Sequence, residues 1–107
     1  MALYELRTYT LYVGKMAEAV KLYQEFFPIF EKAGLGKKLV SFFISDTGTI
    51  NQLHHLWKFD DDADRRRHWE AVYANKDFIE DFAPKIRALL MTQEVKLLHP
   101  APWGPHP

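Results

Sequence analysis

Cysteine is absent from the 107 residues, which excludes a disulfide framework, a thiol nucleophile and thiolate metal ligands. Net charge is absent too: 14 basic residues balance 14 acidic ones, so no overall field attracts nucleic acid or an anionic membrane surface. The apolar run at 39–44 is far too short to span a bilayer, and the N-terminus does not have the pattern of a secretion signal. We therefore expect a cytoplasmic protein that binds neither nucleic acid nor membranes.

Several catalytic motifs are missing as well. The sequence has no glycine-rich phosphate loop and no GxSxG segment, and its spacing places no base beside Ser41 or Ser45. The five histidines lack the spacing with one another, or with carboxylates, that a metal site would use. The sequence accordingly predicts no bound metal and no cofactor.

Apolar residues make up 48% of the chain and aromatic residues 15%. This is enough for one hydrophobic core, so we predict a single domain over residues 1–107. The alternation at 3–9 is typical of a strand. Apolar residues at steps of four and three over 16–30 predict a helix that bends near Pro28 and ends at the glycines of 34–36.

The middle of the chain predicts a hairpin followed by a second helix. Residues 38–59 have the pattern of two strands around a turn at 46–49, where a glycine can adopt a positive φ. The aspartates at 60–62 favour a helix start, and apolar residues continue at helical spacing to about Leu90. We expect an interruption of this helix at 75–77.

A last strand is predicted at 92–99, and the proline-rich segment 100–107 that follows suits neither a central strand nor a helix. The resulting order is βαββαβ. This order is typical of the α+β ferredoxin-like fold, an antiparallel sheet with its helices on one face. Because the strands carry apolar residues on both faces, the face without helices is predicted to need a partner.

Two adjacent histidines, His54 and His55, stand in the third predicted strand. Neighbours on a strand point to opposite faces, so the two are not expected to serve one site. His55 shares its face with Asn51 and Trp57. A histidine in such surroundings is most often a core residue with a satisfied hydrogen bond. The sharper alternative is a pocket histidine that moves a proton.

Charged residues of the first strand favour the pocket. The first and third strands are central neighbours in this fold, which would bring Glu5 and Arg7 close to His55. Burying such charges without partners is costly, so they either pair or line a wet cavity. We predict that His55 and Arg7 are catalytic, with His55 moving a proton and Arg7 holding an anionic oxygen. The predicted ligand-binding residues are Glu5, Tyr9, Asn51 and Trp57.

We expect this site on the sheet face away from the helices. Leu6 and Leu56 suit packing against helices, whereas the charged residues make better cavity walls. The run Arg65–Arg67 is predicted to be a solvated helix face, with Asp61 paired to Arg65 and Asp62 to Arg66 at i,i+4. The aromatic residues predicted to form the core are Tyr23, Phe26, Phe27, Phe30, Trp69 and Phe82.

Three segments resemble the NIPSNAP family, in the family's order: "YELRTYTL" at 4–11, "GTINQLHHLWKFDDDADRRRHW" at 48–69 and "KIRALLMTQEVKLLHPAPW" at 85–103. The resemblance implies a dimeric α/β barrel, in which two ferredoxin-like sheets pack face to face. It implies no known reaction. Related dimeric barrels include cofactor-independent monooxygenases, small-molecule isomerases and haem-binding proteins, and the link to them is at the level of the fold.

Three classes of function therefore stay open. The first is an enzyme of the cofactor-independent monooxygenase or isomerase kind. The second is a ligand- or haem-binding barrel without turnover, and the third is a protein-interaction module. We expect a homodimer with a pocket for a small hydrophobic or anionic ligand.

Overall fold

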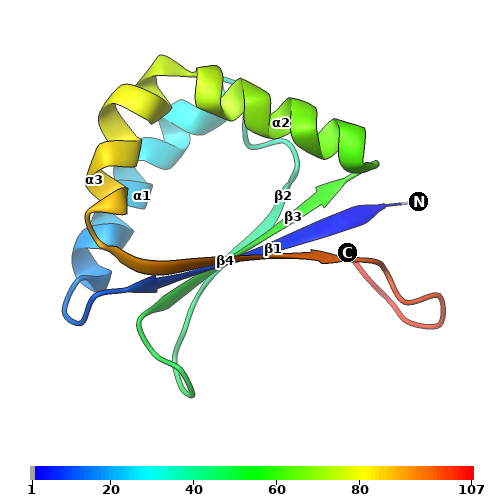
Figure 1. The fold of residues 1–107 in the computed structure, drawn as a ribbon, viewed down its shortest axis with the longest axis horizontal. Coiled ribbons are helices and arrows are strands. Elements are labelled where there is room, and N and C mark those ends of the chain that lie inside the picture. Colours follow the sequence, from blue (N-terminus) through cyan, green and yellow to red (C-terminus); the bar gives the residue numbers. More distant parts are fainter. Residues whose placement is uncertain (1) are drawn as a thin grey trace.

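The computed structural model describes residues 2–107 as one layer of sheet covered on one side by helices (Figure 1). The antiparallel sheet has the order β2-β3-β1-β4 and consists of β1 (Leu3–Leu11), β2 (Leu39–Ile44), β3 (Gln52–Phe59) and β4 (Leu90–Leu98). The covering layer consists of α1 (Met16–Lys32), α2 (Asp62–Ala74), the π-helical turn η1 (Asp77–Phe82) and α3 (Ala83–Arg87). The predicted ferredoxin-like α+β fold is confirmed.

The central strands β1 and β3 pair so that Arg7 lies opposite His55 and Glu5 lies opposite Trp57. Every second residue of β3 is buried, from Leu53 to Phe59, as the alternation of side chains along a strand requires. His54 and His55 therefore lie on opposite faces of the sheet, as predicted.

Helix α1 continues through Pro28 and ends where the sequence places a glycine. Gly34 has a φ of +79°, its amide donates to the carbonyl of Glu31 at 2.9 Å, and the amide of Leu35 donates to that of Phe30 at 3.1 Å. These two bonds form a Schellman motif, which needs a residue that tolerates positive φ.

Within residues 2–107 neither α1 nor any other helix is long and apolar enough to cross a membrane.

Helix α2 begins at an aspartate cap and ends at the predicted interruption. The Asp61 side chain accepts a hydrogen bond from the amide of Asp64 at 2.8 Å. Asn75 has an extended backbone, with φ −78° and ψ 121°, and its side chain accepts from the amide of Phe78 at 2.9 Å. The extended residue stops α2, and the side-chain bond starts η1.

The end of the helical layer differs from the prediction. α3 stops at Arg87, and Leu90 is the first residue of β4, where it pairs with Leu11. The prediction that the helix extends to about Leu90 is therefore wrong in its last turn. Leu90 has helical spacing in the sequence, but its backbone pairs with β1 instead. Pro84 lies in the first turn of α3, where a missing amide hydrogen is tolerated.

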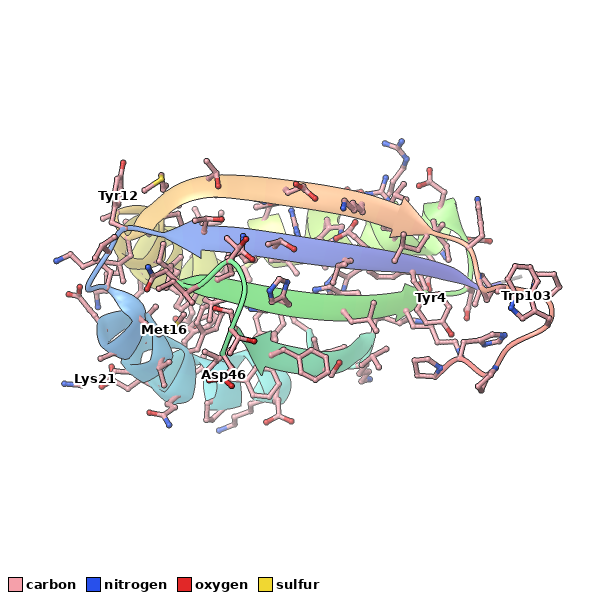
Figure 2. All side chains as sticks on the ribbon, turned by 90° about the horizontal axis from the view of Figure 1, so that it is seen from below. Tyr4, Tyr12, Met16, Lys21, Asp46 and Trp103 are labelled. Atoms are coloured by element: carbon pink, nitrogen blue, oxygen red, sulfur yellow. The ribbon has the colours of Figure 1, made fainter. Side chains whose placement is uncertain are left out.

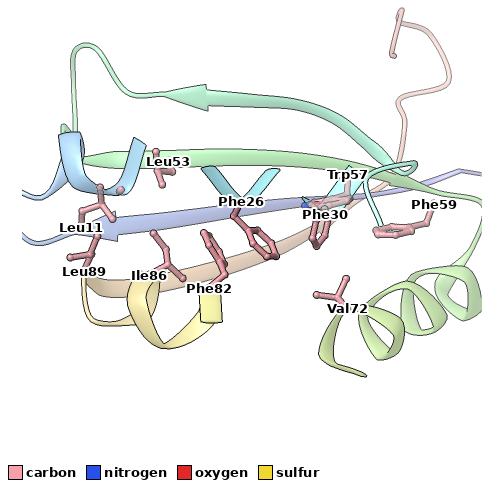
Figure 3. Packing of buried hydrophobic residues seen from close by; sticks show 11 residues of the cluster. Leu11, Phe26, Phe30, Leu53, Trp57, Phe59, Val72, Phe82, Ile86 and Leu89 are labelled. Carbon is pink, nitrogen blue, oxygen red and sulfur yellow. The ribbon is translucent and has the colours of Figure 1, made fainter. Parts of the chain in front are cut away.

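The core lies between the sheet and the helices (Figure 3). Phe26 of α1 and Phe82 of η1 stack with ring centroids 4.4 Å apart. Phe30 is buried beside them, and the remaining aromatic residues predicted for the core, Tyr23, Phe27 and Trp69, pack against this cluster. The predicted aromatic core is confirmed.

The proline-rich segment 100–107 turns back toward the start of β1. The hydroxyl of Tyr4 donates a hydrogen bond to the carbonyl oxygen of Pro107, and the His106 ring lies edge-on to Tyr4 with centroids 6.3 Å apart. Trp103, 88% exposed, stands at the far end of the molecule (Figure 2). The segment is thus an extended arm attached at Tyr4.

Candidate functional site

The side chains predicted to form a site lie on the helix side of the sheet. Arg7, His55 and Trp57 are 8%, 6% and 3% exposed, and the His55 ring lies 5.2 Å from that of Tyr23 in α1. On the opposite, open face, His54 Nδ1 lies 3.2 Å from the hydroxyl of Thr8. The predicted sheet face is therefore wrong. The charged residues of β1 contact side chains of α2, and strand alternation alone does not predict these contacts.

A pocket lies between the sheet and the helices of the single chain. The pocket has a cavity volume of about 90 Å³, several times the volume that one water molecule needs. Aromatic side chains from strands and helices form most of its wall. They are Tyr9, Tyr23, Phe26, Phe27, Phe30, Phe42, Trp57, Trp69, Tyr73, Phe78 and Phe82.

Few polar groups interrupt this aromatic wall. Arg7 and His55 line the pocket from the sheet, and Arg87 and Gln93 line it from α3 and β4. Arg87, Gln93 and Tyr73 of α2 are exposed, so the pocket reaches solvent beside β4. Four predicted site residues thus meet in one pocket: Arg7, Tyr9, His55 and Trp57.

Glu5 lies behind Arg7, outside the pocket, and is 1% exposed. Its Oε1 accepts hydrogen bonds from Arg65 Nη1 at 3.0 Å and from Trp69 Nε1 at 3.3 Å, and its Oε2 lies 3.6 Å from Arg7 Nε. The guanidinium of Arg7 in turn lies over the Trp69 ring, 4.0 Å from the centroid. The buried carboxylate and the indole of α2 together hold Arg7 in place.

The arginine run is only partly the solvated face that its sequence predicts. Arg66 and Arg67 are exposed, but the Arg65 side chain is 18% exposed and reaches inward to Glu5. Arg65 also pairs with Asp62 at 2.9 Å, whereas Asp61 caps the helix. The expected Asp61–Arg65 pair is therefore wrong, because Asp61 is used by the backbone at the start of α2.

The ring of His55 is enclosed by the rings of Phe42, Tyr9 and Tyr23, at centroid distances of 4.4, 5.0 and 5.2 Å. Burial, with the nearby charge of Arg7 as the next cause, lowers the pKa of His55 from 6.5 to about 3. The imidazole is neutral at physiological pH, so it can donate and accept a hydrogen bond but is a weak general base. Burial also raises the pKa of Tyr9 and of Tyr23, so both hydroxyls keep their protons.

Two predicted ligand-binding residues, Glu5 and Asn51, do not line the pocket, and several residues that do line it are not predicted from the sequence. Asn51, with a φ of +62°, does not line the pocket, and its carbonyl accepts a hydrogen bond from the amide of Leu11 at 2.8 Å. Tyr23 and Trp69 line the pocket although their helical spacing indicates only core packing. No sequence signal pointed to Arg87. Within residues 2–107, no three histidine or carboxylate side chains converge as metal ligands.

The NIPSNAP family model matches residues 4–105. The chain belongs to the NIPSNAP family. Protein NipSnap homolog 3A of Homo sapiens is 30% identical over 105 residues, and this chain spans about 40% of the length of that relative. A NIPSNAP family protein from Agrobacterium tumefaciens has a TM-score of 0.88 and 27% identity over 98% of both chains.

The fold also extends beyond the NIPSNAP family. A variant of SnoaB, a cofactor-independent oxygenase from Streptomyces nogalater, has a TM-score of 0.64 and 18% identity over 98% of both chains. At this identity the likeness shows a shared fold alone.

The Glu5–Arg65 pair should contribute much more to stability than the neighbouring Asp62–Arg66 pair. Arg65→Met removes a partner from a carboxylate that has almost no access to water, and we expect the unfolding free energy to fall by about 3 kcal/mol. Arg66→Met, the control, should leave it nearly unchanged because exposed pairs contribute little. Urea unfolding of both variants measures the difference. Equal losses would contradict the inward position of Arg65.

The lowered pKa of His55 should make the fold sensitive to acid. The unfolded chain takes up a proton at His55 near pH 6.5 and the folded chain only near pH 3, so stability is complete above 6.5 and falls as the pH drops between these values. Between pH 7.5 and 5.0 this amounts to about 2 kcal/mol.

A His55→Phe variant should therefore lose about 2 kcal/mol less than the unaltered protein over the same pH interval. Burial lowers the pKa of His68 to about 4, but His68 is present in both proteins and cancels in the comparison. Urea unfolding at the two pH values tests this, and identical pH slopes would show that His55 is not buried as a neutral group.

Proposed function

We propose that this protein binds a small, flat, largely apolar molecule in the pocket between its sheet and its helices. The observation that carries the proposal is the composition of the pocket wall: eleven aromatic side chains and a few polar groups. Aromatic rings favour stacked or edge-on contacts with other flat rings, and a few fixed polar groups then orient the ligand.

A cofactor-independent oxygenase- or isomerase-like reaction is the second candidate. It is supported by the fold shared with SnoaB and by the strand register that places Arg7 opposite His55 at the pocket wall. Arg7 would stabilise a developing oxyanion, and the neutral His55 would hydrogen-bond to it. Because His55 is a weak base, ligand binding is the function that the site supports first. A haem- or ligand-binding barrel without turnover, or an interaction module, are the remaining alternatives.

We also propose that two copies associate through the open face of the sheet (Figure 2). Leu6 and Leu56 lie on this face, half-buried. Phe43 pairs with His54 and Leu98 pairs with Tyr4, which puts both on the same face, and they are 57% and 40% exposed. Exposed apolar side chains on a sheet face that no helix covers favour packing against a second sheet.

The three tryptophans allow a direct test of pocket binding. Trp57 and Trp69 line the pocket, whereas Trp103 is exposed on the arm. We expect titration with 2-naphthamide, a flat neutral probe, to shift the indole N–H signals of Trp57 and Trp69 in heteronuclear NMR spectra. The Trp103 signal, identified with a Trp103→Phe variant, should not move.

The two histidines supply a matched control. His55→Ala removes a ring from the pocket wall and should weaken probe binding about tenfold, while His54→Ala on the open face should leave it unchanged. Native mass spectrometry of the purified protein would show a co-purified ligand directly. A probe that moves no pocket signal would reject the binding proposal and favour an interaction module.

The proposed homodimer should bury more than ~1,200 Å² in total, as stable interfaces do, and persist at micromolar concentration. Leu56→Glu places a charge in the covered face and should produce monomers in sedimentation equilibrium. Ile29→Glu, at a 44% exposed position on the helical side, should not. A monomeric unaltered protein at micromolar concentration would reject the proposal.

A further inference from the structure

We propose that the pocket selects an anion, namely a flat aromatic molecule whose ring bears a carboxylate or phenolate oxygen that pairs with Arg7. This inference rests on the proposed binding function and narrows it to a class of ligand. Four observations carry it: the charges of the wall, the shared counter-ion of Arg7, the unused hydrogen-bond donor of Trp57 and the placement of Arg7 on an indole ring.

The charged groups of the pocket wall all have one sign. Arg7 lies at the sheet and Arg87 at the α3 side, and among residues 2–107 no aspartate or glutamate lines the pocket. A ligand cation would meet two guanidinium groups in a largely apolar site, which is unfavourable. A ligand anion would meet two opposite charges.

Within residues 2–107, Arg7 shares its counter-ion with a second arginine. Glu5 is the acid beside it, and the same carboxylate accepts a shorter hydrogen bond from Arg65, 3.0 Å against the 3.6 Å contact with Arg7 Nε. One negative charge therefore serves two guanidinium groups. Asp62 pairs with Arg65 as well, but it also pairs with Arg66 and is half exposed, so it only partly compensates for the second charge.

One buried donor of the pocket wall, Nε1 of Trp57, has no hydrogen-bond partner within residues 2–107, and Trp57 is 3% exposed. Nε of Arg7 instead faces Oε2 of Glu5 at 3.6 Å. Buried donors are nearly always paired, so a ligand acceptor beside Trp57 would complete this one. Together with the protonated hydroxyls of Tyr9 and Tyr23, Trp57 makes a wall that offers donors, and ligand oxygens are the natural acceptors.

The placement of Arg7 fits it for a charged oxygen attached directly to a ring. Its guanidinium lies 4.0 Å above the centroid of Trp69, while Glu5 lies on the side away from the pocket. A guanidinium fixed in this way loses little conformational freedom when it binds a carboxylate or phenolate. The surrounding aromatic wall then contacts the ring that carries the oxygen.

Three naphthalene probes of similar size and different charge separate charge from size: 2-naphthoate, 2-naphthamide and 2-naphthylmethylammonium. Each is titrated into the unaltered protein at pH 7, and the indole N–H signals of Trp57 and Trp69 report on the pocket. We expect 2-naphthoate to bind at least about tenfold more tightly than 2-naphthamide, and the ammonium probe to bind most weakly.

Variants then assign the preference to Arg7. Arg7→Met keeps an unbranched side chain and leaves Glu5 its hydrogen bonds from Arg65 and Trp69, so the fold should persist, and a thermal melt checks it. We expect this variant to bind 2-naphthoate and 2-naphthamide equally. Arg66→Met, a charge deletion at an exposed position, should keep the full preference.

The outcomes separate the two proposals. Equal affinity of the anionic and neutral probes in the unaltered protein overturns the anion preference and leaves the binding pocket standing. A preference that survives in Arg7→Met overturns the assignment to Arg7. If none of the probes shifts Trp57 or Trp69, the binding function fails and the anion preference fails with it.

Discussion

The buried carboxylate of Glu5 is the interaction on which the rest of the site depends. It lies on the central strand β1 and contacts Arg65 and Trp69 of α2, so it joins the sheet to the helical layer through charge-assisted hydrogen bonds. A carboxylate at 1% exposure is unfavourable without such partners. The register of α2 over the sheet is thereby tied to Glu5, and with it the position of the Trp69 ring that supports Arg7.

Strand alternation predicted which residues share a face but not which side that face is on. Arg7, Tyr9, His55 and Trp57 do come together, because side chains two apart on a strand point the same way and β1 pairs with β3. The choice of side failed because charged residues in an isolated strand pattern suggest contact with water. Glu5 is instead buried against Arg65, which lies 60 positions later in the chain and has the sequence pattern of a solvent-exposed helix residue.

Helical positions were harder to interpret than strand positions. The spacing of Tyr23 and Trp69 predicts burial correctly, yet a buried helix face and the wall of a pocket have the same periodicity. Only the three-dimensional structure shows that the helical layer and the sheet leave space between them. Arg87 is exposed on a helix of five residues, and nothing in its surrounding sequence distinguishes it from other surface arginines.

Asn75 divides the helical layer into two pieces, α2 before it and η1 with α3 after it, and each piece makes its own contacts with the sheet or the pocket. α2 carries the anchoring contacts to Glu5, whereas η1 and α3, after the break, supply Phe78, Phe82 and Arg87 to the pocket. Changes in length or sequence after Asn75 can therefore reshape the pocket entrance while the anchor stays in register. The contacts that fix α2 on the sheet and the exposed Arg87 at the pocket mouth thus lie on different pieces of the chain, so a substitution at Arg87 need not disturb the contacts of Glu5.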